Sequence, residues 1–458
     1  MDDSLVATQL AQDARVKQAK ELLLEAIKEH QQKITTIRPP LAQHKKTYQE
    51  TLQAFAKQRG IKMWYPYLGS GIGHGALVEL HDGSVKYDFI SGIGAQYFGH
   101  SHPTIIEAAI DASIGDIVME GNLQQNIDTI VLTKQLLEAS GMDHCFLTTS
   151  GSMAIENGLK IAFQYRQPAY RILAFERCFS GRTLATAQIS DNALYRQGLP
   201  NTLAVDYVPF FDADDPAGST ANTVATLKSL LARYPGQYAA MIFELIQGEG
   251  GFYPGDVRFF EAIIEILKAE NVSVFIDEIQ TFARTPELFA FQYFGLEEHV
   301  DIVTLGKAAQ VCATLFRTAF KPREGLLSQT FTASASAIRA SYAMIDNMQR
   351  DGFFGPNGKI AEVNHYFIQN LENLHSRHPD LIRGPFGLGA MVAFTPYAGE
   401  SKDTITLAHA LFEAGVIVFI AGRNPCRIRM LPPIGAISLE DIDNVMAIIE
   451  KTLIKLKP

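Results

Sequence analysis

The chain is poor in cysteine. Its 458 residues include only four, Cys145, Cys178, Cys312 and Cys426, and no two of them form a Cys-x-x-Cys pair. Zinc sites and disulfide frameworks need paired or closely spaced cysteines, so neither is expected and no metal site is predicted. Scattered, reduced thiols are typical of a cytoplasmic protein, and the cytoplasm is the location that we expect.

Long apolar runs and an excess of positive charge are also missing. No uninterrupted apolar stretch approaches the ~18 residues that a membrane span needs, and the opening Met-Asp-Asp-Ser-Leu does not have the pattern of a signal peptide. The 40 Lys and Arg residues against 49 Asp and Glu residues give a net charge of −9. This balance disfavours a protein that binds nucleic-acid backbones. We therefore expect neither a membrane nor a nucleic-acid partner.

Motifs for nucleotides and catalytic zinc are absent or out of context. The sequence has no Walker A phosphate loop and no His-Glu-x-x-His. Gly71-Ile-Gly73-His-Gly-Ala76 loosely matches the dinucleotide-binding fingerprint, but it precedes a predicted hairpin and opens no helix. His100 and His102 have no acidic or cysteine partners at a fixed spacing, so we expect turn or cap histidines.

The length exceeds that of one ordinary core and predicts more than one domain. Residues 1–60 are expected to form a helical extension, which Arg38-Pro-Pro40 interrupts before a second helical stretch from about Ala42 to Lys57. Residues 61–102 are assigned to the first part of a small domain, and an alternating run at 77–90 predicts a hairpin around Asp82-Gly83. Residues 103–337 are assigned to a large domain, and 338–458 to the rest of the small one.

In the large domain, predicted helices alternate with short apolar runs. This alternation predicts an α/β fold with a mostly parallel central sheet, and ligands of such sheets bind beyond the carboxyl ends of the strands. The segment after 338, which includes apolar runs at 390–394 and 416–420, predicts a smaller α+β domain. The runs of the large domain are Cys145–Thr148, Arg171–Phe175, Ala240–Phe243, Val272–Ile276 and Ile302–Leu305.

Two of these runs end on a lysine and an aspartate. Lys307 follows the run at 302–305, and Asp277 closes the run at 272–276. A lysine and an aspartate at neighbouring strand ends are what a pyridoxal phosphate (PLP) site requires. The amine forms a Schiff base with the cofactor aldehyde, and the carboxylate keeps the pyridine nitrogen protonated. Each residue alone is more often an exposed surface charge, so the hypothesis depends on its surroundings.

A candidate phosphate site follows another of the runs. Ser150-Gly151-Ser152 opens a predicted helix, where free backbone N–H groups and the positive end of the helix dipole favour an anion. A plain Ser or Gly helix cap is the alternative. After the next run, Phe179 can stack on a flat ring and Arg182 can bind a carboxylate, or they are a core aromatic and a surface cation.

Further charged residues stand at two other strand ends. Glu244 and Glu249 flank a turn that ends in Gly-Glu-Gly-Gly251, where they are either functional or solvated loop acids. Arg427 and Arg429 alternate with Ile428 and share one face of a predicted strand. One of them can point into a cleft; the alternative is an exposed edge.

In this order, the residues resemble class III (ω-amino acid:2-oxo acid) aminotransferases of PLP fold type I, which include acetylornithine, ornithine, 4-aminobutyrate and lysine ε-aminotransferases. The resemblance covers about Tyr65 to the C-terminus. Its motifs include Gly99-His-Ser-His-Pro103, Ser150-Gly-Ser152, Gly181-Arg-Thr183, Glu244-Leu-Ile-Gln-Gly-Glu-Gly-Gly251, Ile276-Asp-Glu-Ile-Gln-Thr281, Thr304-Leu-Gly-Lys307 and Ile428-Arg429.

The resemblance implies a role for each matching residue, and it implies a homodimer whose subunits share their active sites. Lys307 and Asp277 are the catalytic pair. Lys307 also moves the proton from Cα of the substrate to C4′ of the cofactor. Arg182 and Arg429 bind substrate carboxylates, and Glu249 pairs with Arg429 when no carboxylate is there. Ile93 contacts substrate and disfavours ornithine itself. The residues implied to bind PLP are Gly151, Ser152, Phe179, Glu244, Asp277, Gln280, Lys307 and, across the dimer, Thr330.

The implied activity is a ping-pong transamination from a primary amine, with an ω-amino group as the donor and 2-oxoglutarate as the acceptor. Two alternatives stay open: an aminomutase or racemase of the same superfamily, and a catalytically silent PLP-binding regulator. The second is motivated by departures from the family pattern. Glycine-rich stretches of the family are replaced at 280–286, 308–315 and 330–335, and Ser180 stands where the family has His. Fewer glycines are expected to reshape the substrate entrance.

Overall fold

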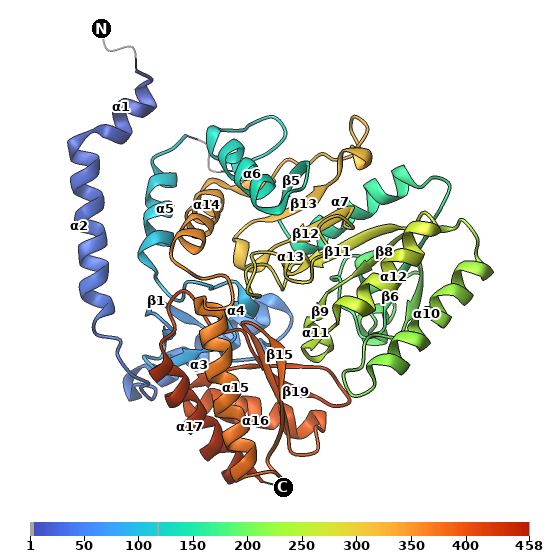
Figure 1. Ribbon diagram of the computed structural model, residues 1–458. Helices are drawn as coiled ribbons and strands as arrows, with labels where there is room; N and C mark the ends of the chain where they lie inside the picture. Colours follow the sequence, from blue (N-terminus) through green and yellow to red (C-terminus); the bar gives the residue numbers. More distant parts are fainter. Residues whose placement is uncertain (1–3, 117–118, 458) are drawn as a thin grey trace.

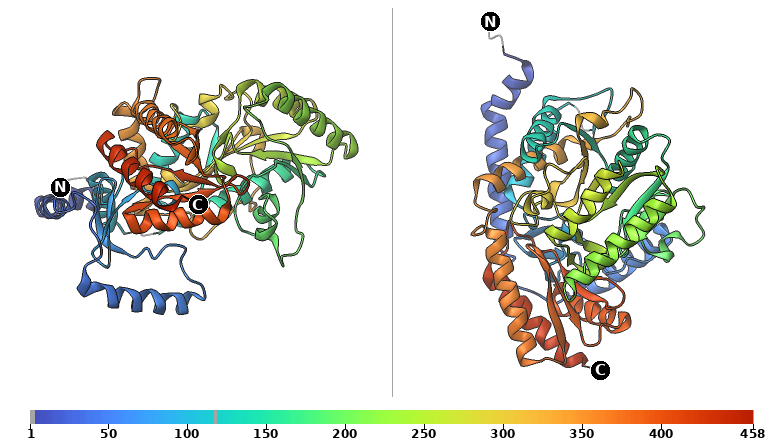
Figure 2. Two further views of the ribbon diagram at one scale, coloured as in Figure 1. Left: turned by 90° about the horizontal axis from the view of Figure 1, so that it is seen from below. Right: turned by 45° about the vertical axis from the view of Figure 1, so that its right-hand side comes forward.

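The computed structural model describes residues 4–116 and 119–457. In Figure 1 a large α/β domain, coloured cyan to yellow, lies beside a smaller domain that combines blue strands from the first part of the chain with orange and red elements from the last part. The fold class expected from the sequence is confirmed. The first two N-terminal helices lie along one side of the body, and the third lies against the small domain (Figures 1 and 2).

A seven-stranded sheet forms the centre of the large domain. Its order is β5-β13-β12-β11-β8-β6-β7, and every strand is parallel to the others except β13, which is antiparallel to both neighbours. All five predicted strands are present. The antiparallel strand was not predicted. The bounds are β5 His144–Thr148, β6 Arg171–Phe175, β7 Ala204–Val208, β8 Tyr238–Phe243, β11 Ser273–Glu278, β12 Ile302–Leu305 and β13 Cys312–Phe316.

Helices cover both faces of this sheet, because its strands are apolar on both sides. Phe275 of β11 packs with Ile155 and Leu159 of α7 on one face, whereas Val274 and Ile276 belong to the core that contains α12 on the other. Buried parallel sheets need such two-sided cover. The main helices are α5 Pro103–Ser113, α6 Ile127–Ser140, α7 Gly151–Tyr165, α10 Pro216–Arg233, α12 Val257–Ala269 and α14 Ala335–Arg350.

Two four-stranded sheets build the small domain. The first joins β1 Gly69–His74, β2 Leu77–Leu80 and β3 Val85–Asp88 to β17 Val416–Ile417, and the predicted hairpin is its antiparallel β2–β3 pair. The second has the order β15-β16-β19-β18. Its strands are β15 Ile382–Leu388, β16 Met391–Pro396, β18 Phe419–Ala421 and β19 Arg427–Met430, and the covering helices are α15 Lys359–Arg377, α16 Ser401–Ala414 and α17 Leu439–Leu456.

The apolar run at 416–420 contributes to two strands, β17 and β18. Its first half pairs with β3 and its second half pairs with β19, so the chain passes from one sheet to the other at Val418. A continuous apolar run cannot reveal this change of sheet, because every residue of the run stays at least partly buried. The run therefore connects the two sheets of the small domain.

Three helices precede the first sheet: α1 Val6–Gln12, α2 Ala14–Gln31 and α3 Ala42–Arg59. The expected break near residues 38–40 is confirmed. Figures 1 and 2 show α1 and α2 along one side of the body, on the outer side of α5. Lys20 of α2 forms ion pairs with Glu107 and Asp111 of α5 at 2.8 and 2.9 Å. The extension is therefore attached to the body at α5.

The remaining elements are short. Within residues 4–116 and 119–457, no helix is long and apolar enough to cross a membrane. In the same ranges, no three His, Cys, Asp or Glu side chains are grouped so that they could hold a metal ion. All four cysteines are free thiols. The short elements are α4 Ser91–Gly94, α8 Thr186–Ile189, α9 Ala193–Arg196, α11 Gly248–Gly251, α13 Ala290–Tyr293, β4 Met119–Glu120, β9 Ile246–Gln247, β10 Tyr253–Pro254, β14 Ala333–Ser334, η1 Lys307–Ala309 and η2 Thr318–Phe320.

The domain boundaries stay a prediction. Helix α14, which spans the predicted boundary at 337/338, packs against α5 and α6 of the large domain.

His102 caps α5 by accepting a hydrogen bond from the Thr104 amide at 3.3 Å, and His100 bonds Asp88 at 3.0 Å. The cap role expected for His102 is confirmed.

Candidate active site

Asp277 and Lys307 lie at neighbouring strand ends. Strands β11 and β12 are parallel, and Asp277 of β11 pairs with Thr304 of β12. Thr304 precedes Lys307 by three residues. Lys307 follows the last residue of β12 by two positions and opens the short η1 turn. The neighbouring strands expected from the sequence are confirmed, and they place an acid and an amine at one edge of the sheet.

The amine of Lys307 has no partner among the described residues. Its Nζ takes part in no hydrogen bond or ion pair there, and burial lowers the pKa of the amine to about 8. The nearby Arg429 lowers the pKa further, whereas the carboxylates of Glu249, Asp277 and Glu244 act in the opposite direction. The backbone of Lys307 has φ 49°, a conformation that residues with a side chain seldom adopt. An unpaired amine with a lowered pKa is suited to nucleophilic chemistry, because a larger share of it is neutral near pH 7 than for an ordinary lysine.

Two buried carboxyl groups lie close to this amine. Asp277 Oδ1 accepts hydrogen bonds from the Ile279 amide at 3.0 Å and the Thr304 hydroxyl at 3.4 Å, while its other oxygen bonds no described residue. Burial raises the pKa of Asp277 to about 6 and the pKa of Glu244 to about 8, the latter also through repulsion by Asp277. Asp277 is therefore ionised at neutral pH and Glu244 is largely protonated.

Ser150, Gly151 and Ser152 stand at the N-terminus of α7. Ser150 caps the helix by accepting a hydrogen bond from the Met153 amide at 3.3 Å, so the plain cap considered as an alternative is correct for this serine. Ser152 Oγ accepts a hydrogen bond at 3.4 Å from the amide of Arg182. Gly181 has φ 122°, and a Cβ there would lie 2.2 Å from Ser152 Oγ. The loop therefore approaches the helix end closely only because residue 181 is glycine.

Phe179 and Arg182 lie together near this helix end. The amide of Phe179 donates to Glu244 Oε1 at 3.1 Å, and Glu244 Oε2 accepts from the Gly248 amide at 2.8 Å. Glu244 thus ties the loop that carries Phe179 to the first residue of α11. The guanidinium of Arg182 stacks on the ring of Tyr195 at 3.9 Å, and Phe179 meets the same ring edge-on.

Tyr195 was not identified from the sequence. It lies in the short helix α9, in a segment without a recognisable motif, and the fold alone brings it to Arg182. With Phe179, Arg182 and Glu249 it lines a cavity of about 620 Å³ between the two domains. The exposed Arg182 has no ion-pair partner among the described residues, so its charge is free for an anion in this cavity.

Arg429 is fully buried and faces two of the predicted site residues. Its Nη2 lies 2.5 Å from Glu249 Oε1, and its Nη1 donates to Gln280 Oε1 at 3.2 Å. Its Nε is buried without a partner. The exposed-edge alternative is therefore wrong for Arg429, and the structure gives this arginine a carboxylate partner from α11.

Arg284 is a second buried arginine that the sequence did not single out as a site residue. Its guanidinium donates to the carbonyl oxygens of Pro432 at 2.7 Å and Gly94 at 3.0 Å, and no carboxylate pairs with it among the described residues. Because Pro432 follows the strand of Arg429 and Gly94 adjoins Ile93, Arg284 fastens the loop after Gln280 to both segments. The unusual glycine-poor loop therefore has its own anchor.

Ile93 and Thr330 are not hydrogen-bonded to the other predicted residues. Ile93 is part-buried, with φ 62°, which is strained for a β-branched side chain. It lines a cavity of about 340 Å³ with Tyr67, His100 and Phe419. Thr330 is exposed in the loop before β14. Within one chain, the structure leaves Thr330 facing solvent.

Comparison with known proteins places these residues in one family. Residues 70–453 match the family of class-III aminotransferases. The chain is 28% identical to an acetylornithine aminotransferase of Methanocaldococcus jannaschii, over 84% of this chain and 93% of that protein. It is 30% identical to a [LysW]-aminoadipate semialdehyde transaminase of Deinococcus radiodurans, over 84% of this chain and 86% of that one.

Solved structures show the same fold. Lysine aminotransferase from M. tuberculosis aligns with a TM-score of 0.79 and 20% identity, covering 89% of this chain and all of that one. Acetylornithine aminotransferase from Elizabethkingia anophelis aligns with a TM-score of 0.72 and 26% identity, covering 89% of this chain and 99% of that one. The alignments extend over both domains, so the two-domain arrangement is that of fold type I.

Proposed function

The chain belongs to the class-III aminotransferase family, and we propose that it carries out its PLP-dependent transamination with Lys307 and Asp277 at the centre of the site. Enzymes of this family transfer an amino group from an amine donor to a 2-oxo acid. For this chain we propose an ω-amino group as the donated group and 2-oxoglutarate as the acceptor. The names of the relatives support an ω-amino group as the donated group. The two arginines, Arg182 and Arg429, support a dicarboxylic acceptor such as 2-oxoglutarate.

The residues present fit the cofactor. An unpartnered amine at Lys307, a free Asp277 oxygen and a helix N-terminus at Gly151 and Ser152 offer partners for an aldehyde, a pyridinium nitrogen and a phosphate. PLP, when bound, supplies an aldehyde that condenses with amines and a ring that draws electrons from the adjacent carbon. Phe179 has the exposure and the position to stack on that ring. Gln280 and Glu244 are proposed to contact its polar edge.

Asp277 is proposed to hold a proton on the ring nitrogen. Its carboxylate is ionised at neutral pH, and the Ile279 amide and Thr304 hydroxyl fix its orientation. A fixed negative charge favours a protonated pyridine, and protonation strengthens the electron withdrawal on which the reaction depends. The second Asp277 oxygen has no partner among the residues described, which leaves it available for this contact.

Lys307 is proposed to move the proton between two carbons once the incoming amine has displaced it. A base is most effective when its pKa is near the working pH, and burial brings the pKa of Lys307 to about 8. Its neighbours Glu249 and Asp277 stabilise the protonated form that follows proton capture. The amine can therefore both accept and return the proton near neutral pH.

Arg429 and Glu249 are proposed to alternate between the two half-reactions. With a donor that carries no carboxylate at this place, Glu249 neutralises Arg429, as it does here at 2.5 Å. A dicarboxylic 2-oxo acid offers its own carboxylate to Arg429, and Glu249 must then move away. Arg182, exposed in the 620 Å³ cavity, is proposed to bind the other carboxylate. Ile93 is proposed to shape the donor pocket.

A homodimer with shared active sites is proposed as the working form. Leu123 is 98% exposed and Phe331 54% exposed, and they lie on two segments that pair through Glu120 and Ala333. Exposed apolar side chains of this size around one strand pair mark an interaction surface. Thr330 lies next to Phe331, where it is proposed to reach the phosphate in the partner. The cytoplasm stays the predicted location.

A half-reaction screen tests the proposal. The holoenzyme is mixed with single ω-amino acids, and the visible absorbance of the lysine-bound cofactor is followed before and after 2-oxoglutarate is added. We expect loss of the band with the true donor and its return with the acceptor, and neither change in Lys307→Ala. No net exchange of the amino group with added 2-oxoglutarate would favour an aminomutase or racemase, and no response of the band to any amine would favour a silent protein.

A further inference from the structure

A cavity of about 950 Å³ lies between the two domains, beside the active-site cavity. Arg177, Tyr253 and Pro425 line both cavities and form the wall between them. The larger cavity is bounded by the loop after β7 on the large domain and by β15 and β19 on the small domain. None of the residues predicted for transamination lines it, so its use is not explained by that reaction.

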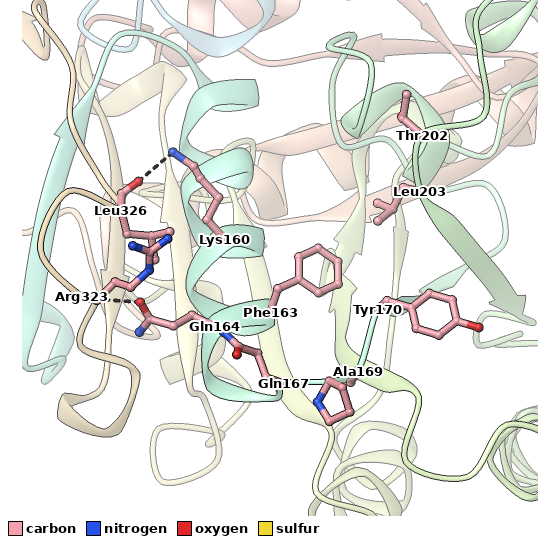
Figure 3. A pocket seen from close by; sticks show the side chains of 11 residues that line it. Lys160, Phe163, Gln164, Gln167, Ala169, Tyr170, Thr202, Leu203, Arg323 and Leu326 are labelled. Carbon is pink, nitrogen blue, oxygen red and sulfur yellow. Dashed lines mark hydrogen bonds between the residues drawn. The ribbon is translucent and has the colours of Figure 1, made fainter.

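A third cavity provides a contrast, because its polar groups bond one another. Figure 3 shows Lys160 Nζ donating to the Leu326 carbonyl at 3.0 Å and the Arg323 amide donating to Gln164 Oε1 at 2.8 Å in a cavity of about 540 Å³. The 950 Å³ cavity differs in this respect, since several of its buried polar groups have no partner.

Arg427 is the clearest of these groups. Its side chain is 3% exposed and lies between the rings of Phe386 and Tyr253, 3.4 and 4.0 Å from their centroids. Nη1 donates to the Gly251 carbonyl at 2.6 Å, but Nε is buried without a partner, and no carboxylate pairs with the guanidinium among the described residues. Burial lowers the pKa of Arg427 to about 10, so it stays a cation at neutral pH. A buried, unpaired cation is costly unless something binds it.

Two neutral groups of the same cavity are also unpartnered. Gln247 Oε1 and Thr395 Oγ1 are buried and form no hydrogen bond within the described chain, although Gln247 Nε2 donates to the Glu176 carbonyl at 2.6 Å. Buried polar atoms are nearly always bonded, so exceptions that gather in one cavity indicate a missing ligand. Together with Arg427 they offer one cation, one acceptor and one hydroxyl.

Acidic side chains outnumber basic ones on the rim of the cavity. Asp212, Asp214, Asp215 and Glu176 line it, are exposed, and form no ion pair with any described residue. Arg177 and Arg383 are the other charged residues of the lining. A buried cation with an acidic rim matches a molecule that carries both a carboxylate and an ammonium group. The walls of aromatic rings favour a small organic molecule over an inorganic ion.

We propose that this cavity binds a free α-amino acid, with its carboxylate on Arg427 and the Thr395 hydroxyl and its ammonium group toward Gln247 Oε1 and the acidic rim. The site needs neither the cofactor nor the transamination chemistry. Because Arg427 also holds Gly251 at the end of α11, the occupant contacts the residue that fixes the short helix bearing Glu249.

Glycine, the smallest α-amino acid, is the probe for the test. Crystals of the holoenzyme are soaked in glycine, and binding in solution is measured by titration calorimetry while the cofactor absorbance is recorded, so that binding at the cofactor is recognised separately. We expect density for glycine on Arg427 and a binding event that leaves the absorbance unchanged. Acetate and ethylamine, tested in the same way, are expected to bind more weakly than glycine.

Three variants complete the experiment. Arg427→Met keeps the apolar stem between the rings and is expected to weaken the absorbance-silent binding at least ~10-fold, the effect of losing a charged hydrogen bond. Thr395→Val is isosteric and removes an unpartnered hydroxyl, so the fold is retained while glycine binding weakens. Arg233→Met, an exposed arginine outside the cavity, is the control and should leave binding unchanged.

The proposal is overturned if no glycine density lies on Arg427, or if the silent binding event is absent or unaffected by both Arg427→Met and Thr395→Val. Acetate binding as tightly as glycine would also overturn the assignment to an amino acid. Because none of these results depends on turnover, failure here leaves the proposed transamination untouched, and failure of the amine screen leaves this site untouched.

Discussion

Arg429 and Glu249 form an ion pair across the two domains, with Nη2 of the fully buried arginine 2.5 Å from Oε1 of the partly exposed glutamate. The arginine belongs to β19 of the small domain, and the glutamate belongs to the short helix α11 of the large one. Such a pair is weak evidence for stability, because removing two charges from water offsets most of their attraction. Its position beside Lys307 instead indicates a role in binding substrates.

Replacing Glu249 with Gln is expected to lower the KM for 2-oxoglutarate roughly 10-fold. The acceptor must displace Glu249 from Arg429, and a neutral amide holds the guanidinium less strongly than a carboxylate by about 1.4 kcal/mol or more. Steady-state kinetics with each substrate varied measures the change. Glu265→Gln, on the exposed face of α12, is the control. An unchanged or higher KM in Glu249→Gln would show that the pair does not compete with the acceptor.

The rate at which the apoenzyme captures PLP is expected to rise with pH with a midpoint near pH 8, and to level off about one pH unit above it. Only the neutral amine of Lys307 attacks an aldehyde, and burial lowers its pKa from 10.5 to about 8, so the neutral form prevails above that value and is lost below it. Stopped-flow absorbance across a pH series measures the midpoint. A midpoint near 10.5 would mean that Lys307 is not held in a desolvating site.

Ser150→Ala and Ser152→Ala are expected to separate stability from cofactor binding. Ser150 caps α7, so its replacement should lower the free energy of unfolding by ~1 kcal/mol with little effect on PLP affinity. Ser152, which bonds the loop of Gly181, should show the reverse. Denaturant unfolding of the apoenzyme and equilibrium binding of PLP measure the two effects. Equal losses of PLP affinity would assign the phosphate site to the helix end as a whole.

Replacing Leu123 with Asp is expected to dissociate the dimer. The side chain is 98% exposed in the single chain, and a charge there would be buried by a partner. Sedimentation equilibrium should give twice the 50.5 kDa chain mass for the wild type and a single chain for the variant. Val257→Asp, at the exposed start of α12, is the control. A wild type that sediments as one chain would refute the homodimer and the role of Thr330.

The sequence could predict the residues at strand ends, because local patterns determine them. Asp277 and Lys307 each follow a short apolar run, and parallel strands bring their carboxyl ends to one edge. The pairing of distant segments has no such local signal. The antiparallel strand β13 follows the altered segment after Lys307, and its partners β5 and β12 are chosen by the whole sheet.

The rest of the site depended on contacts across the domains. Arg427 and Arg429 look alike in sequence, two residues apart on one strand. In the structure, however, Arg429 lies against Glu249, whereas Arg427 lines a different cavity. Tyr195 reaches Arg182 from a segment with no motif. Such roles follow from packing between elements far apart in the chain, which a single sequence does not encode locally.

The attachment of PLP to Lys307, on which every other proposed role depends, can be mapped chemically. The holoenzyme is treated with borohydride, which makes the link between lysine and cofactor permanent, then digested and analysed by mass spectrometry. We expect the added mass on the peptide that contains Lys307 and on no other, with none in Lys307→Ala. An adduct on a different lysine, such as the buried Lys86, or no adduct in fully active enzyme, would show that Lys307 does not carry the cofactor.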